Sequence, residues 1–311
     1  MNSNLLVFCL CIIFSLCGCG DSTNATDTVS AQLEFLSVAE TDSTIQYKPS
    51  ATHMYRECDA GICADSQLFF VFFPGSDGDS SSFKNISNVI GKTGIRVLVL
   101  AYQNNGSLNA VCAAADSCYT NARRDRVKGA VSSSYVMSLS DGVSNRLLRA
   151  LQTLGWTQFY SGSTINWNKI IVGGFSQGAG IAAWIGKHYS VSRVSQFSGT
   201  WDHIAGTTTP ASWLTDMSAT NPSLFYGFTH QDDSIANGVS YLDINWQALG
   251  MGAGSYQRYT TRMTGQKFYT NDSDTACIAD THVCSVADFA IPVNIDGSPK
   301  FSAAWKYICG R

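Results

Sequence analysis

The chain has 311 residues, of which 45% are hydrophobic and 14% charged, and its formal net charge is −3. This much apolar material can build a sizeable core, and so few charges exclude a largely disordered chain. The small negative charge also argues against the binding of nucleic-acid phosphates as the main task.

The N-terminus predicts export. Residues 5–17 form an apolar run that is too short to cross a bilayer, which is typical of a signal peptide covering residues 1–20. The letters LCGC at 16–19 resemble a bacterial lipoprotein box, an alternative in which the leader ends at residue 18 and Cys19 carries a lipid anchor. Both alternatives predict an extracytoplasmic protein, either secreted or held at the cell surface, and no later stretch predicts a membrane span.

With so few charges, the surface must consist largely of Ser, Thr, Asn and Gly, and such a surface is common in exported proteins. Residues 21–65, rich in Ser, Thr and Asp at their start, predict a loosely packed lead-in. A host that glycosylates would recognise four Asn-x-Ser/Thr sequons. These begin at Asn24, Asn85, Asn105 and Asn271.

Apolar strands alternate with helical segments from residue 66 onward. Such alternation predicts an α/β fold, in which a mostly parallel central sheet carries helices on both faces. We expect one domain over 66–311 without a large cap domain, and therefore a fairly open site. Strands are predicted at 68–75, 94–102, 170–172, 193–199, 223–230 and 266–270, and helices at 80–90, 141–156, 179–187, 239–249 and 303–309.

The segment 103–135 is predicted to be a loop pinned by cysteines, with a basic cluster, ARRDR, at 122–126. A run of charges is usually a solvated helix face, and we expect this one to be exposed.

Cysteines after the leader fall into close pairs. In an exported protein such pairs predict short-loop disulfides, although the sequence leaves their connectivity open. A metal site fits less well, because no pair has the two-residue spacing of a zinc knuckle and no second cluster completes four ligands. The close pairs are Cys58 with Cys63, Cys112 with Cys118 and Cys277 with Cys284, which leaves Cys309 as a free thiol or an interchain link.

The stretch 169–189 combines a β-branched strand, a G-x-S-x-G pattern and a helix. In this context the pattern predicts a nucleophile elbow, in which Ser176 occupies a strained turn. Gly174 and Gly178 leave room for that turn because neither has a Cβ atom. The positive end of the following helix would favour negative charge developing beside the hydroxyl.

The elbow sequence GFSQGAG, at 174–180, is similar to those of cutinases and acyl thioesterases. Over residues 66–309 the chain resembles the α/β-hydrolase superfamily. This resemblance implies the α/β-hydrolase fold and a nucleophile, acid and histidine that follow one another in chain order.

The resemblance implies a base and an acid downstream of Ser176. Of the five histidines, His282 alone follows all the plausible acids, so it is the expected base. The turn after the strand at 223–230 resembles the usual acid position, which favours Asp232. Asp233 and Asp202 remain alternatives.

The resemblance also implies two oxyanion donors. One is the backbone N–H of Gln177, and the other is expected from Ser76, with Asp77 as the alternative. Trp201 is expected to line the substrate pocket or to pack in the core. No metal or cofactor is expected.

The resulting hypothesis is a serine hydrolase that cleaves small or polymeric carboxylic esters through an acyl-enzyme. One alternative is a thioesterase or peptidase that uses the same triad, because the triad serves all acyl transfers. Another is an inactive binding or surface protein on the same scaffold. A third is a cysteine-stapled structural protein whose elbow motif is a chance match.

Overall fold

A computed structural model describes residues 30–47, 51–60, 62–63, 67–129, 131–132, 135–235, 238–252, 254, 256–260 and 262–311. The predicted leader, with Cys19 and the sequon at Asn24, lies outside the described residues. Among the helices described, none is long and apolar enough to cross a membrane.

A nine-stranded mixed sheet forms the centre of the molecule, in the order β1-β2-β4-β3-β9-β10-β11-β13-β12. All neighbouring pairs from β4 to β12 are parallel, whereas β1 pairs with β2 and β2 with β4 in antiparallel fashion. The prediction of a mostly parallel α/β sheet is therefore confirmed. The strands are β1 (Leu33–Ser37), β2 (Thr52–Arg56), β3 (Phe69–Phe73), β4 (Arg96–Val99), β9 (Ile170–Phe175), β10 (Arg193–Phe197), β11 (Phe225–His230), β12 (Gln257–Arg258) and β13 (Lys267–Thr270).

Strands β1 and β2 come from the segment that its composition predicted to be a loosely packed lead-in. The structure corrects that prediction, because both strands extend the central sheet on one side. Their antiparallel pairing joins Leu33 to Arg56 and Ser37 to Thr52. Three of the five residues of β2 are buried, but its sequence, THMYR, mixes polar and apolar residues and lacks the continuous apolar run of a central strand.

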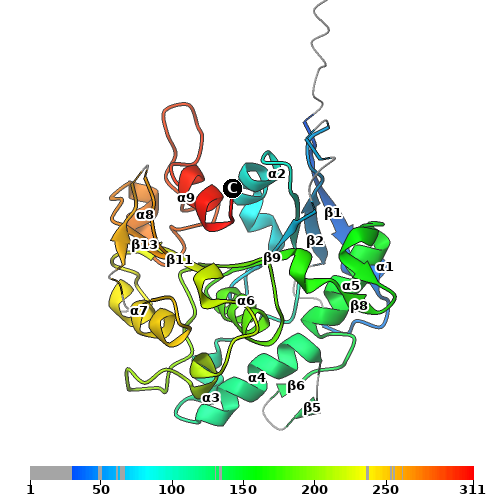
Figure 1. The fold of residues 1–311 in the computed structure, drawn as a ribbon, viewed down its shortest axis with the longest axis horizontal. Helices are drawn as coiled ribbons and strands as arrows, with labels where there is room; N and C mark the ends of the chain where they lie inside the picture. Colours follow the sequence, from blue (N-terminus) through cyan, green and yellow to red (C-terminus); the bar gives the residue numbers. More distant parts are fainter. Residues whose placement is uncertain are drawn as a thin grey trace, which may run out of the picture.

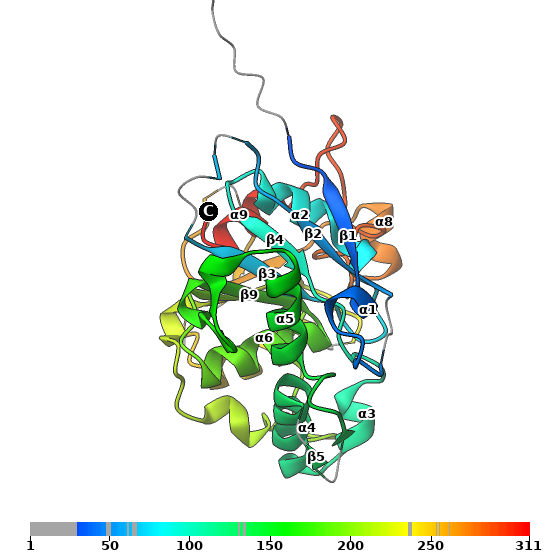
Figure 2. The ribbon, with the colours of Figure 1, turned by 90° about the vertical axis from the view of Figure 1, so that its right-hand side faces the viewer.

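Helices cover both faces of the sheet. Figures 1 and 2 show α2 and α9 on one side of the central strands and α5 and α6 on the other. Helix α6 follows the elbow and packs directly on β3, β9 and β10. The helices are α1 (Val38–Thr41), α2 (Lys84–Gly91), α3 (Leu108–Cys112), α4 (Asp116–Lys128), α5 (Val143–Thr153), α6 (Gln177–His188), α7 (Val239–Ala248), α8 (Thr275–Ala279) and α9 (Ser302–Ile308).

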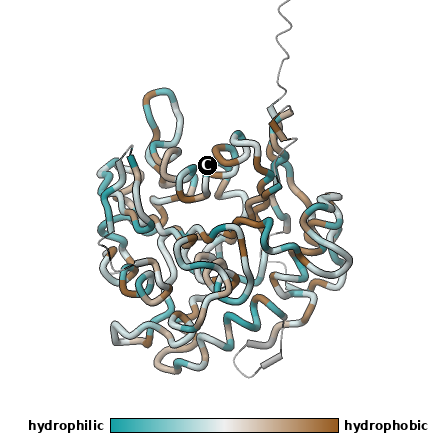
Figure 3. The backbone as a smooth tube through the Cα atoms, in the orientation of Figure 1, coloured by the Kyte–Doolittle hydropathy of each residue, from teal (hydrophilic) through white to brown (hydrophobic). Residues whose placement is uncertain are grey.

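The core follows from the continuous apolar strands. All five residues of β3 and all six of β9 are buried, and hydrophobic stretches, brown in Figure 3, gather along the central strands. Gly173 is required by this packing, because a Cβ there would lie 2.5 Å from the Phe70 ring. Burial on both faces is what the β-branched and aromatic runs predicted.

Two short hairpins, β5–β6 (Val131–Ser132 with Tyr135–Val136) and β7–β8 (Tyr160–Ser161 with Thr164–Ile165), lie outside the central sheet. Within the segment expected to be a loop, at 103–135, the structure instead contains helices α3 and α4.

The basic cluster on α4 is not a solvated face. Arg123 is 1% exposed and Arg126 0% exposed, so the expectation of an exposed cluster is wrong for these two residues. Arg126 donates from Nη2 to the carbonyl oxygen of Asn105 at 3.1 Å. Helix α4 therefore sends two guanidinium groups toward the loops that lie beside the carboxyl ends of the strands.

His53 on β2 gives the fold a pH-dependent stability. The side chain is fully buried, and its Nδ1 accepts a hydrogen bond from the Ala101 N–H at 3.0 Å. Burial, together with the charge of Arg146, lowers the pKa of His53 to about 3. Below about pH 6.5 His53 becomes protonated in the unfolded chain but stays neutral in the folded chain until the pH approaches 3. The free energy of unfolding therefore decreases as the pH falls through this range.

We therefore expect His53→Asn to reduce the acid sensitivity of the protein. One such histidine contributes about 1.4 kcal/mol per pH unit between its unfolded and folded pKa values. Urea denaturation at pH 6.5 and 4.5 should show the wild type losing about 2–3 kcal/mol more than the variant. His203→Asn, at a half-buried position, serves as the control. Equal pH slopes for the wild type and His53→Asn would contradict this prediction.

Candidate active site

Parallel pairing brings five loops to one edge of the sheet. Strands β3, β9, β10, β11 and β13 are neighbours and run in the same direction, so their carboxyl ends lie together. Polar residues at these ends are therefore candidates for a shared site.

Ser176 lies at the tip of a sharp turn between β9 and α6. Its backbone has φ 52° and ψ −116°, a conformation that costs energy for a residue with a side chain. A Cβ on Gly174 would lie 2.3 Å from the carbonyl carbon of Gly178, and one on Gly178 would lie 2.0 Å from the carbonyl oxygen of Phe73. Both glycines are thus required by the turn, as the elbow motif predicted.

His282 lies within hydrogen-bond distance of the Ser176 hydroxyl. The distance from His282 Nε2 to Ser176 Oγ is 2.9 Å. His282 is 4% exposed, and its ring centroid lies 4.9 Å from that of Phe175. The sequence predicted this pairing although the two residues are 106 positions apart.

The carboxylate that contacts His282 belongs to Asp233, not to Asp232. The two Asp233 oxygens lie 2.9 and 3.0 Å from His282 Nδ1, and the side chain is buried. Asp232 is exposed, and its backbone N–H donates to His230 Nδ1 at 3.0 Å. The preference for Asp232 is therefore corrected by one position.

The geometry fixes the tautomer of the imidazole. A carboxylate can only accept, so Nδ1 of His282 carries the proton and donates it to Asp233. Nε2 is then a free acceptor, and the Ser176 hydroxyl donates to it. A hydroxyl whose proton points at a basic nitrogen can be deprotonated as it attacks.

The remaining acid candidate, Asp202, has a different partner. Its carboxylate binds Arg123 through two hydrogen bonds of 2.6 and 2.8 Å and accepts a third from Trp213 Nε1 at 3.0 Å. Arg123 also donates to the carbonyl oxygen of Gln177 at 2.8 Å. This buried ion pair supports the first turn of α6, and nothing in the sequence of the ARRDR cluster predicted it.

The loop after β3 lies against the elbow. A Cβ on Gly75 would lie 3.2 Å from Ser176 Cβ, so the loop backbone passes close to the hydroxyl. The Asp77 N–H donates to the carbonyl oxygen of Asn104 at 3.1 Å and is occupied. Among the described residues, no partner is found for the N–H groups of Ser76 and Gln177. These two donors remain available to a ligand, which favours Ser76 over Asp77.

A pocket of about 310 Å³ opens beside Ser176. Trp201 is one of its walls, 7% exposed, with its indole N–H bonded to the Ser198 carbonyl oxygen at 2.8 Å. The volume of this pocket is at the lower end of the range for small-molecule sites. Its other lining residues include apolar Leu108, Phe175, Ile235 and Val283 and polar Ser76, Ser107, Asn109 and Asp280.

A disulfide pins the loop that carries His282. The structure pairs Cys277 with Cys284, seven positions apart, around that residue. The Thr281 hydroxyl donates to the carbonyl oxygen of Asp232 at 2.6 Å, which ties this loop to the acid turn. The imidazole is therefore held from both sides.

The other cysteines pair as the spacing suggested. Cys58 pairs with Cys63, and Cys112 pairs with Cys118. Cys309 is a free, buried thiol, and burial raises its pKa to about 12. A buried, protonated thiol cannot form an interchain link without a change in the fold.

One group of residues in the described part of the chain has ligand-like spacing. It consists of Glu57, Cys58 and Cys63. The two sulfurs in this group bond to each other in the structure, so neither is available as a thiolate ligand.

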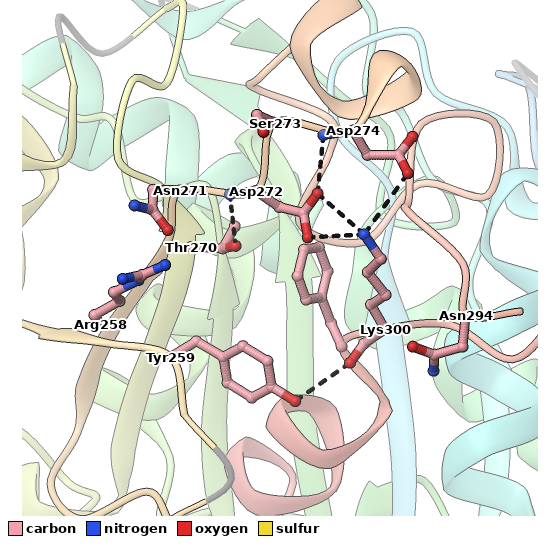
Figure 4. A pocket seen from close by; sticks show the side chains of 10 residues that line it. Arg258, Tyr259, Thr270, Asn271, Asp272, Ser273, Asp274, Asn294 and Lys300 are labelled. Atoms are coloured by element: carbon pink, nitrogen blue, oxygen red, sulfur yellow. Dashed lines mark hydrogen bonds and ion pairs between the residues drawn. The ribbon is translucent and has the colours of Figure 1, made fainter.

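A hollow of about 750 Å³ lies between β13 and the approach to α9 (Figure 4). Lys300 forms ion pairs there with Asp272 at 3.2 Å and Asp274 at 3.7 Å. The exposed sequon residue Asn271 also lines it. Although this hollow is larger than the pocket beside Ser176, its residues lack a nucleophile next to a base, so it is a poorer candidate for chemistry.

Comparison with known protein families matches no family model, and comparison with curated proteins finds no significant match.

Proposed function

We propose that this protein is a serine hydrolase of the α/β-hydrolase fold that cleaves carboxylic esters through an acyl-enzyme. One observation carries the proposal: Ser176 Oγ, His282 and Asp233 form a continuous hydrogen-bonded chain with distances of 2.9 Å at each link. A nucleophile, a base and a group that orients the base are what acyl transfer requires.

The first step is attack by Ser176 on the carbonyl carbon of the ester. His282 Nε2 takes the hydroxyl proton, and Asp233 stabilises the imidazolium that forms. The carbonyl oxygen becomes an oxyanion, which accepts hydrogen bonds from the N–H groups of Gln177 and Ser76. Preorganised donors of this kind are each worth about 10²–10³ in rate.

The second step releases the alcohol and then the acid. The tetrahedral intermediate collapses, the bond from carbon to the alcohol oxygen breaks, and His282 gives its proton to that oxygen. Water then enters, His282 Nε2 takes one of its protons, and the hydroxide oxygen bonds to the acyl carbon. The ester bond to Ser176 breaks and the serine recovers its proton, so the enzyme returns to its starting state.

We also propose an extracytoplasmic location, secreted or lipid-anchored. Three disulfides in one chain support it, since such bonds persist in oxidising compartments and are rare in the cytosol.

Ser176→Ala tests the proposal. The variant should fold normally, lose labelling by a fluorophosphonate probe, and lose at least about 10⁴-fold in kcat on short-chain p-nitrophenyl esters. Ser212→Ala, at an exposed serine, should keep both properties. Hydrolysis that survives in Ser176→Ala, or a wild-type protein that never reacts with the probe, would refute the assignment.

A further inference from the structure

We propose that Asn104 is a positioning residue that fixes the spacing between the two oxyanion donors. This inference rests on the proposed function, because it concerns the same oxyanion site. Asn104 lies in the loop after β4 and is 1% exposed. Its contacts join two segments that are far apart in the chain.

The first segment is the loop after β3, which carries Ser76. Asn104 Nδ2 donates to the carbonyl oxygens of Gly75 at 2.7 Å and Gly78 at 2.8 Å. The Asp77 N–H donates back to the carbonyl oxygen of Asn104 at 3.1 Å. One residue thus holds the loop on both sides of Ser76.

The second segment is the start of α6, which carries the Gln177 N–H. Gln177 Nε2 donates to the same carbonyl oxygen of Asn104 at 2.8 Å. The Gln177 side chain therefore links the elbow to Asn104. This role is separate from that of the Gln177 backbone N–H, which is an oxyanion donor. Arg123, bonded to the Gln177 carbonyl oxygen, holds this residue from another direction.

Small displacements of an oxyanion-hole donor lower the rate strongly. An oxyanion-hole donor works only near 2.7–3.1 Å from the developing charge, and a misplacement of about 1 Å costs about 100-fold. Removal of the Asn104 carboxamide would leave the Gly75 and Gly78 carbonyl oxygens without this donor and free the loop to shift. Asn104 is not among the residues that line the pocket beside Ser176, so it acts on the reaction only through the two segments.

Asn104→Ala should therefore lower kcat by about 10- to 100-fold and leave KM within about threefold on p-nitrophenyl acetate and butyrate. Affinity for an aryl trifluoromethyl ketone, which forms a hemiketal oxyanion on the serine, should fall by the same factor. Asn145→Ala is the matched control, because Asn145 Nδ2 also joins two acceptors, Asp42 and the Ser140 carbonyl oxygen, at 3.0 Å each. Its kcat and its affinity for the ketone should stay at wild-type values.

Gln177→Leu tests the hydrogen bond between Gln177 and Asn104 by changing the donor instead of Asn104. It tests the positioning role even if Asn104→Ala fails to fold. It keeps the backbone N–H and removes the side-chain hydrogen bond to the Asn104 carbonyl oxygen, at a residue that also lines the pocket. We expect about a tenfold loss in kcat with matching loss of affinity for the ketone. The inference is overturned by wild-type kcat in the folded variants, by a loss confined to KM, or by an equal loss in Asn145→Ala. If the wild type itself reacts with neither ester nor fluorophosphonate, the proposed function fails, and this inference with it.

Discussion

The Asp233→Asn variant should fold like the wild type and lose about 10³–10⁴-fold in kcat. The carboxylate of Asp233 accepts from His282 Nδ1, and an amide in its place can present its NH₂ group to the ring. The imidazole then carries its proton on Nε2, so it cannot accept the proton of Ser176. Esterase kinetics on a short-chain ester, together with a thermal melt, would measure both parts of the expectation.

Asp232→Asn is the matched control. The Asp232 side chain is exposed, and its two contacts with His230 and Thr281 come from its backbone N–H and carbonyl oxygen. We expect kcat within about threefold of wild type, because these backbone contacts survive the change. A larger loss in Asp232→Asn than in Asp233→Asn would reverse the choice between the two acids.

The Arg123→Met variant should lose about 3–5 kcal/mol of unfolding free energy. Arg123 and Asp202 are each 1% exposed at the side chain and are 2.6 Å apart. Without its partner the Asp202 carboxylate stays buried and unpaired, which is among the costliest single changes in a folded protein. Urea denaturation at neutral pH would measure the loss.

Two further variants distinguish the cost of leaving Asp202 buried and unpaired from the cost of removing an arginine side chain in general. Arg149→Met removes an exposed arginine, 3.7 Å from Asp42, and should change the unfolding free energy by no more than about 1 kcal/mol. The double variant Arg123→Met with Asp202→Leu should recover a large part of the loss, since no buried charge remains. A double variant as unstable as Arg123→Met alone would show that the effect is one of packing rather than charge.

Local patterns in the sequence were sufficient for the elbow. The strand, the glycines and the helix around Ser176 are neighbours in the chain, so their residue types report the turn directly. The contact of Ser176 with His282 was predictable from the resemblance to α/β-hydrolases, which implies the chain order serine, acid, histidine, because His282 alone follows all the acid candidates.

The acid could not be chosen from the sequence, because adjacent residues in a turn point in different directions. Which one turns inward depends on local bonds. The Asp233 N–H bonds to the His230 carbonyl oxygen at 3.3 Å, and the Asp232 N–H bonds to His230 Nδ1 at 3.0 Å. These contacts turn the second aspartate toward the imidazole.

The buried arginines could not be predicted for a different reason. A charged residue on a helix is normally solvated, and the partner that makes burial possible for Arg123 is 79 positions away. Strand β2 was missed because its sequence, THMYR, mixes polar and apolar residues although most of it is buried, and β1 was missed because it is an edge strand that is only partly covered. Its apolar residues are then too few to distinguish it from a loop.

On the proposed function, the order of the chain also bears on synthesis, because Ser176 and its elbow precede His282 by 106 positions. A nascent polypeptide that ends before residue 282 carries Ser176 and the elbow but lacks the proposed base, His282. Cys277 and Cys284, which flank His282, emerge before and after it and form their disulfide only after oxidation. On the proposed function, a copy that stops before residue 282 would therefore lack a complete triad and should not react with a fluorophosphonate probe.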